Sequence, residues 1–232
     1  MRDSRRFGSR FRLPIYKKRL PRRQGKEARP TEIAAGSTGL SGKAALPPLL
    51  VPAPGRGSLC EQEIDTPLGT MVGIADCAGL RLLQFADASK LPAQRVRILR
   101  WVGRSPEPRP NRQLKALETQ LAEYFAGKRL RFSIAIAPIG TSWQLRVWHR
   151  LLHCGPGKTV CYKDLARSLG RPQAARAVGS AVGANPLPIL VPCHRVVPQA
   201  GGLGGYTGRP WRKQRLLSLE TAADHTESTT EE

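Results

Sequence analysis

The sequence has no long apolar run and no closely spaced pair of cysteines, and both absences exclude classes of protein. No window approaches the roughly 18 to 20 apolar residues that a membrane helix needs, and no charged-then-apolar segment resembles a secretory signal. The five cysteines are an odd number without a CxxC pair, which argues against a disulfide framework or a zinc ribbon. We therefore expect a cytoplasmic protein without membrane contact, in which one thiol is free to react.

Acidic residues are also scarce. Only 17 Asp and Glu stand against 38 Lys and Arg, which gives a formal net charge of +21. Residues 1–57 hold fourteen basic and three acidic residues, so about half of the excess lies there, and the rest of the chain still carries +10. This excess favours a polyanion such as nucleic acid as a partner. A generally basic proteome would leave the same charge on solvated arginines, so charge alone does not decide.

Residues 1–57 run from an Arg-rich stretch into a Gly-, Pro-, Ser- and Ala-rich one, without a sustained apolar period. This composition predicts a basic disordered arm. We expect a tail without specific function; a DNA-binding arm, a targeting segment and an over-extended gene start are the alternatives. At the other end, residues 222–232 are predicted to form an acidic tail.

Residues 58–138 have the patterns of a small α/β domain. The predicted elements are a β-hairpin of Thr70–Ala75 and Leu80–Phe85, helices at 92–102 and 114–125, and a strand at 130–136 with one buried face. No pattern in this domain suggests chemistry, so we expect it to be a scaffold.

Residues 139–221 predict a second, mostly helical domain. Thr141 and Gln144 stand at capping-box spacing, which predicts the start of a helix. The segments 162–169 and 174–182 flank a short polar turn and predict a helix-turn-helix. The second of these helices consists almost entirely of small residues, and Arg176 is its projecting long side chain. Such a helix can approach a DNA backbone closely in a narrow groove, with little base-specific readout.

An apolar run held between prolines leads from Asn185 to Pro192 and delivers Cys193 beside His194. A thiol is a strong nucleophile only as thiolate, which a nearby histidine favours. Because adjacent residues of a strand point to opposite faces, His194 can serve Cys193 only from a turned backbone or through a water. Glu220, which follows the helical segment 211–219, is the candidate to orient the imidazole.

The segment Gly140–Glu220 resembles the catalytic domain of the O6-alkylguanine-DNA alkyltransferases, also called methylated-DNA–protein-cysteine methyltransferases. The matching stretches are GTSWQLRVW, VCYKDLA, AARAVGSAVGANPLPILVPCHRVV and GGLGGYTGR. Residues 66–138 are similar to the family's N-terminal domain. The resemblance implies an α+β fold, in which a small, ribonuclease H-like α/β domain precedes a mostly helical, winged-helix-like catalytic domain that contains the helix-turn-helix.

The resemblance also implies the reaction. The substrate would be double-stranded DNA containing O6-alkylguanine, with O4-alkylthymine as a further candidate. Cys193 would accept the alkyl group irreversibly, so each molecule acts once, as a monomer and without a cofactor. His194 would deprotonate Cys193 through a water and be held by Glu220, while Asn185 fixes the turn. The protein would work in the cytoplasm, at the nucleoid.

The resemblance further implies two binding surfaces. Tyr162 would stand by the target phosphate and help to rotate the nucleotide, and Arg176 would fill the gap left in the stack by the flipped base. The residues implied for the DNA-binding surface are Tyr162, Ala174, Ala175, Arg176, Ala177 and Gly179. Those implied for the lesion pocket are Pro188, Val196, Tyr206, Thr207, Gly208 and Lys213, with the Thr207 amide on guanine O6, the Val196 carbonyl on the exocyclic amine, and Lys213 assisting protonation of the leaving group.

Some family members hold a zinc ion in the N-terminal domain through Cys and His. Cys60 and Cys77 lie in that region, but all four histidines lie C-terminal to it, so a complete tetrahedral site is not expected. Cys60, Cys77, Cys154 and Cys161 are instead expected to pack as small apolar residues.

Three other functions rank lower. A non-enzymatic protein that binds alkylated DNA is second, because it would not need Cys193. A transcription factor is third, because the helix at 174–182 lacks base-reading side chains. A Cys–His hydrolase is fourth, because it would need an oxyanion site and neither Arg176 nor a helix-turn-helix.

Overall fold

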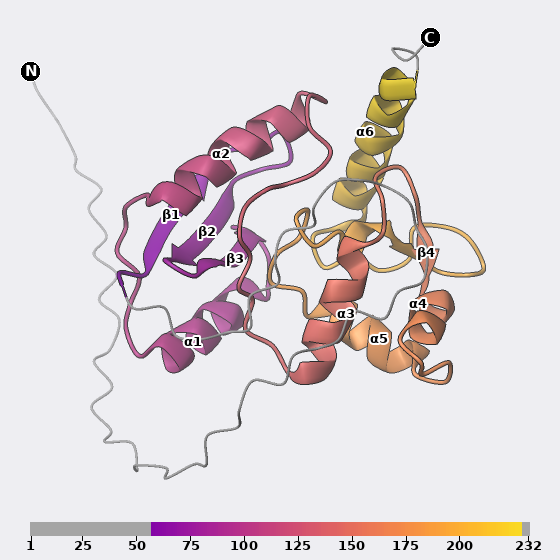
Figure 1. The fold of residues 1–232 in the computed structure, drawn as a ribbon, viewed down its shortest axis with the longest axis horizontal. Helices are drawn as coiled ribbons and strands as arrows, with labels where there is room; N and C mark the ends of the chain where they lie inside the picture. Colours follow the sequence, from indigo (N-terminus) through magenta and orange to yellow (C-terminus); the bar gives the residue numbers. More distant parts are fainter. Residues whose placement is uncertain (1–56, 229–232) are drawn as a thin grey trace, which may run out of the picture. The chain divides into compact units, whose positions relative to one another are not determined.

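The structure, a computed structural model, describes residues 57–228. All of the predicted arm except Gly57, and residues 229–232 of the predicted tail, lie outside the described residues. The elements in chain order are β1 (Cys60–Ile64), β2 (Met71–Asp76), β3 (Gly79–Phe85), α1 (Leu91–Val102), α2 (Arg112–Phe125), α3 (Ser142–Leu152), β4 (Val160–Cys161), α4 (Tyr162–Ser168), α5 (Ala175–Gly183), the 3₁₀ turn η1 (Cys193–Arg195), β5 (Val196–Val197) and α6 (Pro210–Ser228) (Figure 1). Within this described part, no helix combines the length and apolar character required to cross a bilayer.

The N-terminal sheet is an antiparallel meander in the order β1-β2-β3, with α1 and α2 on its two sides (Figure 1). Strand residues alternate between the two faces. Val72, Ile74 and Leu82 pack with Ile98 of α1, whereas the neighbouring strand positions pack with the leucines of α2. Both faces of the sheet are therefore buried, and the predicted hairpin is confirmed.

The predicted strand at 130–136 is wrong. This segment is extended but makes only one isolated bridge, between Leu80 and Ile136. The predicted alternation is present, since Leu130, Phe132, Ile134 and Ile136 are buried and Arg131 and Ser133 are exposed. The side chains thus bury one face without the continuous backbone pairing that defines a strand. The edge strand β1 was not predicted, because Glu61, Gln62 and Glu63 interrupt its apolar pattern.

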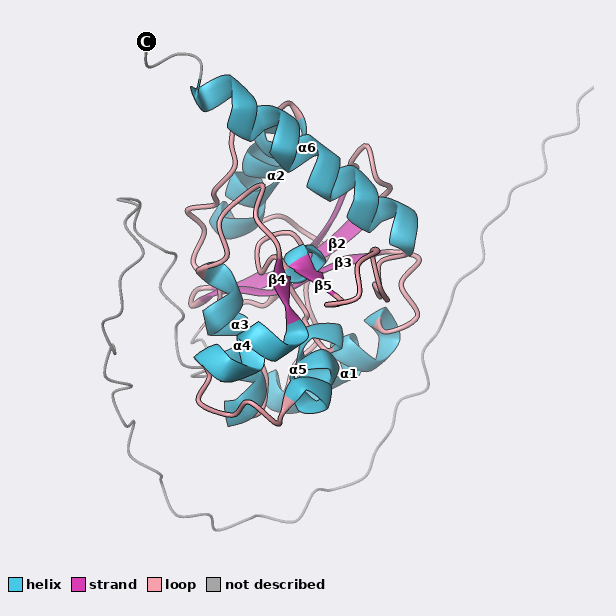
Figure 2. Ribbon diagram, turned by 90° about the vertical axis from the view of Figure 1, so that its right-hand side faces the viewer, coloured by secondary structure: helices cyan, strands magenta, loops and turns pink. Residues whose placement is uncertain are grey.

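The C-terminal half is built around α3. The predicted capping box is confirmed: Gln144 N donates to the Thr141 hydroxyl, and Thr141 N donates to the Gln144 side chain. The buried indole of Trp148 donates to Ala181 O at 2.8 Å, which fixes α5 against α3. The short strands β4 and β5 pair in parallel, and α3, α4 and α5 lie on one side of this ladder with α6 on the other (Figures 1 and 2). This half holds the predicted helix-turn-helix and the Cys193 loop together.

Helix α6 is longer than predicted. We expected it to end before Glu220 and to give way to an acidic tail, but it continues to Ser228. No Gly or Pro follows Glu220 up to that point, and Thr221-Ala222-Ala223 continues the helix. Arg212, Leu216 and Glu220 are buried at four-residue spacing, so one stripe of α6 faces the interior.

Of the four other cysteines, Cys60 fully meets the expectation, because it is buried in the core. Cys77 is exposed, because it occupies the turn between β2 and β3. Cys154 and Cys161 are half-buried. Packing as small apolar residues therefore does not describe Cys77.

Candidate active site

The loop that carries Cys193 is held by its own polar groups. The Asn185 side chain accepts from Leu187 N at 3.0 Å and donates to Val191 O at 2.8 Å, and so closes the loop across its prolines. Ile189 has a φ of 74°, a conformation that costs free energy for a β-branched residue and persists only where the surroundings enforce it. Pro186 O also accepts from Leu83 N of β3 at 2.9 Å. The loop is therefore a rigid support fixed to the N-terminal sheet.

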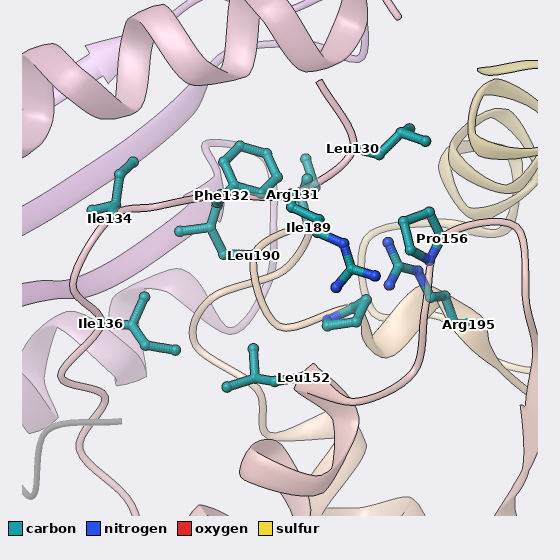
Figure 3. A pocket seen from close by; sticks show the side chains of 11 residues that line it. Leu130, Arg131, Phe132, Ile134, Ile136, Leu152, Pro156, Ile189, Leu190 and Arg195 are labelled. Atoms are coloured by element: carbon teal, nitrogen blue, oxygen red, sulfur yellow. The ribbon is translucent and has the colours of Figure 1, made fainter. Parts of the chain in front are cut away.

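Behind this loop lies a pocket with mostly apolar walls (Figure 3). Its lining comes from Leu130, Arg131, Phe132, Ile134 and Ile136, from Leu152 and Pro156, and from Ile189, Leu190, Pro192 and Arg195. None of the residues predicted for the lesion pocket lines it. The buried face of segment 130–136 thus packs beside the Cys193 loop at Ile189, Leu190 and Pro192.

The 3₁₀ turn η1 settles how Cys193 and His194 are arranged. Successive residues of such a turn are about a third of a turn apart, not on opposite faces as in a strand. Cys193 is 5 % exposed and His194 is fully buried. The turned backbone that the sequence required for cooperation between these two side chains is present.

The carboxylate of Glu220 is the centre of a buried network. His194 Nε2 lies 2.8 Å from Oε1, and the Arg195 guanidinium donates to both carboxylate oxygens at 2.8 and 2.9 Å. The Tyr124 hydroxyl donates to Oε1 at 2.8 Å. Burial by itself raises the pKa of Glu220, but the hydrogen bonds and charges of His194 and Arg195 outweigh it and hold this pKa far below its ordinary value.

The ionised Glu220 determines the tautomer of His194. An ionised carboxylate can only accept, so Nε2 must carry the proton that lies between the two groups. Burial lowers the pKa of His194, against the opposing effect of Glu220, and so favours the neutral ring. Nδ1 then has a free lone pair, and among the described residues this buried nitrogen has no hydrogen-bond partner. His194 is arranged as a base.

Cys193 is held in its neutral form in the resting protein. Burial raises the pKa of its thiol, and the Asn185 side chain, the backbone, the Lys213 charge and the Tyr206 hydroxyl partly offset this effect. A nucleophilic role for this thiol would therefore require that it lose its proton. The groups that oppose the burial effect are those that would stabilise a thiolate.

The residues predicted for the lesion pocket differ in their burial. Pro188, Val196 and Gly208 are buried, Tyr206 is half-buried, and Thr207 is exposed. The Tyr206 hydroxyl lies beside Cys193. A Cβ on Gly208 would come within 2.6 Å of the Tyr206 ring and 3.3 Å of the Phe85 ring, so this position has no space for a side chain.

Lys213 is fully buried and connects two parts of the site. Its ammonium donates to Val196 O at 2.5 Å and to Leu203 O. It thereby ties strand β5 to the glycine-rich loop at 198–209. The Val196 carbonyl predicted to read the guanine amine therefore already accepts one hydrogen bond.

The predicted DNA-binding residues lie at α4 and α5. Tyr162 begins α4, and a Cβ on Gly179 would lie 3.7 Å from its ring. Arg176 and Ala177 are exposed, whereas Ala174, Ala175 and Gly179 are half-buried. Helix α5 thus presents small side chains and one arginine to solvent.

Two residues of the Glu220 network were missed by the sequence analysis. Tyr124 belongs to the domain expected to be a scaffold, yet its hydroxyl reaches Glu220. Its signal was present, since a phenol on the buried face of α2, in line with Leu117 and Leu121, needs a polar partner. Arg195 follows His194 inside an apolar segment, and a guanidinium there also needs a buried carboxylate.

Comparison with known proteins places this geometry in a family. Residues 142–222 match the model described as 6-O-methylguanine DNA methyltransferase, DNA binding domain. A methylated-DNA–protein-cysteine methyltransferase of Mycobacterium leprae is 39% identical over 159 residues, covering 68% of this chain and 90% of the relative. The inducible enzyme of that name from Bacillus subtilis is 42% identical over 111 residues, covering 48% of this chain and 62% of the relative.

Solved structures agree. The crystal structure of the O6-methylguanine methyltransferase of Mycobacterium tuberculosis matches with a TM-score of 0.61 and 35% identity, covering 71% of this chain and 94% of that one. A structure of the M. tuberculosis protein in complex with DNA has the same TM-score and identity and covers 70% and 93%. The observed mixture of helices and small sheets is shared with these proteins.

Removing the Tyr124 hydroxyl should destabilise the protein. In Tyr124→Phe the ring keeps its packing, but Glu220 loses a donor, so we expect the free energy of unfolding to fall by about 1.5–3 kcal/mol, the range for a hydrogen bond to a charged group. Urea unfolding measures this change. Thr119→Val, which removes an exposed hydroxyl from the same helix, should change stability by less than about 0.5 kcal/mol. Equal effects of the two substitutions would contradict the assignment.

The network should also set the acid stability. The pKa values of Glu220 and His194 both lie below their ordinary values of 4.5 and 6.5, so the stability that they confer is complete above about pH 6.5 and is lost as the pH falls through these values. Glu220→Gln should lose about 3–5 kcal/mol at neutral pH, because Arg195 keeps a buried charge without its carboxylate. It should also show a shallower loss below pH 4.5.

Urea unfolding measured across the acid range tests this second expectation. Glu63→Gln, a substitution of an exposed carboxylate on β1, serves as the control and should follow the wild-type curve. An acid slope of Glu220→Gln that equals the wild-type slope would rule out a depressed pKa at Glu220.

Proposed function

This chain belongs to the family of methylated-DNA–protein-cysteine methyltransferases and repairs alkylated DNA by transferring the alkyl group to one of its own cysteines, which we propose is Cys193. The observation that carries this assignment is the pairing of His194 with Glu220 directly after Cys193 on η1. It supplies an oriented neutral base next to a buried thiol. Cys60, Cys77 and Cys161 have no histidine beside them in the sequence. His153 precedes Cys154, but it is exposed and its Nδ1 lies 3.0 Å from the backbone oxygen of His149 instead of a carboxylate.

The transfer follows from this arrangement. His194 Nδ1 takes the Cys193 proton through a water, and the thiolate attacks the alkyl carbon in line with its bond to guanine O6. The S–C bond forms as the C–O6 bond breaks, and the electron pair of the broken bond stays on the guanine, which is then protonated. The product at Cys193 is a thioether. The described site offers no group that could cleave it, so each molecule acts once.

The lesion would be held between the Cys193 loop and the loop at 198–209. Pro188 forms the wall that meets the alkyl group, while Tyr206 and Gly208 form the opposite wall. The Thr207 amide donates to guanine O6, and the Val196 carbonyl uses its second lone pair for the exocyclic amine. The hydrogen bonds of Lys213 to Val196 O and Leu203 O support a positioning role for this residue beside the assistance to the leaving group implied by the resemblance.

The DNA would lie along α4 and α5. The small residues of α5 let the helix approach a narrow groove, Tyr162 stands by the rotated nucleotide, and Arg176 occupies the gap in the stack. The exposed side chains of Lys163 and Arg171 add positive charge to this surface. Double-stranded DNA that contains alkylated guanine is the partner.

Finer features of the fold and setting are part of the same proposal. The antiparallel β1-β2-β3 meander with α2 packed on it supports a ribonuclease H-like N-terminal domain. The α3–α5 unit beside the β4–β5 ladder supports a winged-helix-like catalytic domain. We also propose a monomer that works at the nucleoid.

Mass spectrometry tests the acceptor. After incubation with a duplex that contains one O6-methylguanine, the protein should gain one methyl group in place of the thiol hydrogen, mapped to Cys193 and stoichiometric with repaired base. Cys193→Ser should bind the duplex without a mass change, and Cys77→Ser should react like the wild type. Tight binding by the wild type without a mass change would instead identify a protein that only recognises the lesion.

Arg176→Ala tests base flipping. Transfer from the duplex should slow by at least about tenfold, because the stack loses the side chain that replaces the rotated base. Transfer from a single-stranded oligonucleotide should change by less than about twofold, since that substrate has no paired stack to open. Arg167→Ala, which removes an exposed arginine paired with Asp164, is the control. Equal slowing on both substrates would refute the role in flipping.

A further inference from the structure

A carboxylate of the N-terminal domain holds two arginines of the lesion-pocket region. Asp87 lies two residues after the end of β3, in the turn that leads toward α1. Arg209 Nε lies 3.0 Å from Asp87 Oδ2, while Arg212 Nη1 and Nη2 lie 2.7 and 3.2 Å from Oδ1 and Oδ2. These contacts hold the pKa of Asp87 below its ordinary value, with the hydrogen bond from Arg212 as the main cause. We call Asp87, Arg209 and Arg212 the Asp87 clasp.

The two arginines of the Asp87 clasp differ in burial and in backbone conformation. Arg212 is 5 % exposed, donates to Leu68 O at 2.8 Å and has its guanidinium 4.0 Å from the centre of the Phe85 ring. It is therefore a fixed part of the N-terminal core. Arg209 is exposed and has a φ of 73°, a conformation that costs free energy for a residue with a Cβ. Its contact with Asp87 favours this conformation at the end of the glycine-rich loop.

The clasp is continuous with the wall of the lesion pocket. Gly208 precedes Arg209, and a Cβ at Gly208 would come within 2.6 Å of the Tyr206 ring and 3.3 Å of the Phe85 ring. The Tyr206 hydroxyl lies beside Cys193. The preceding loop is rich in glycine, with positive φ values at Gly201, Gly202 and Gly204, and such residues give the backbone little stiffness of its own. The position of the Tyr206–Gly208 wall therefore depends on its attachments.

Two of those attachments are polar side-chain contacts. Lys213 holds the loop at Leu203 O, and the Asp87 clasp holds its end. We propose that Asp87 is a specificity-determining residue: through the clasp it sets the separation between the Tyr206–Gly208 wall and Cys193, and with it the size of the alkyl group that the site transfers. The proposal rests on the function assigned to Cys193. Opening the clasp lets the wall move outward, which favours bulky groups and positions a methyl group less well.

Single-turnover transfer from two duplexes tests this. One duplex contains O6-methylguanine and the other O6-benzylguanine, and protein is in saturating excess so that differences in DNA affinity do not enter the rate. For Asp87→Asn the ratio of benzyl to methyl rate should rise by at least about threefold, the scale of a modest change in pocket contacts. Asp87→Glu, which keeps the charge, should return the ratio toward the wild-type value. Glu63→Gln, with the same change of net charge on β1, should leave it unchanged.

A second variant and a second measurement protect the conclusion. Arg209→Gly removes one arm of the clasp and suits the positive φ, so it should shift the ratio in the same direction without a loss of fold. Hydrogen exchange of the Tyr206–Arg209 amides, measured without DNA, should be faster in Asp87→Asn than in the wild type.

The proposal is overturned if both rates fall by the same factor in Asp87→Asn and Arg209→Gly, or if neither rate changes. It is also overturned if exchange at Tyr206–Arg209 is unaffected. If the wild-type protein transfers neither group to Cys193, the proposed function is wrong. The exchange measurement then still decides whether Asp87 holds the loop.

Discussion

The buried carboxylate of Glu220 is the constraint on which the rest of the site depends. A carboxylate without water is stable only when donors surround it, and here the donors come from α2, through Tyr124, and from η1, through His194 and Arg195. Satisfying this one charge therefore fixes α6, η1 and α2 relative to one another. It also fixes the tautomer of His194, and so leaves the lone pair on Nδ1.

The segment 58–138 contributes more than support. It supplies the phenol on Glu220, the backbone amide of Leu83 that holds Pro186 O, and the carboxylate of Asp87 on the end of the lesion-pocket loop. Each contact acts on a different part of the site. Tyr124 acts on the Glu220–His194 pair, Leu83 on the Cys193 loop, and Asp87 on the Tyr206–Gly208 wall. The candidate reactive residues thus lie in the C-terminal half, while their geometry is determined by both halves. This division explains why short sequence motifs around Cys193 identify the reaction but do not describe the pocket.

The elements that the sequence predicts correctly depend on residues close to one another in the chain. The capping box of Thr141 and Gln144, the hairpin across β2 and β3, and the two short helices around Gly170 are set by residues close in sequence, and the structure confirms them. The prediction of a strand at 130–136 is wrong because apolar alternation indicates which face of a segment is buried. It does not indicate whether a neighbouring backbone is available for pairing. The longer α6 was missed because Glu220 is acidic but also a good helix former.

By itself, the sequence determined which groups are candidates for the reaction: a cysteine beside a histidine after a proline-held run, a small-residue helix with one arginine, and a basic surface. It did so because these features depend on residue type and short spacing. Tertiary structure alone decided the environment of those groups. Tyr124 meets Glu220 across 96 residues of chain, and Asp87 meets Arg209 across 122, and no local periodicity encodes such pairings. They follow from burial, since a buried charge requires its partners to be brought to it from wherever the fold places them.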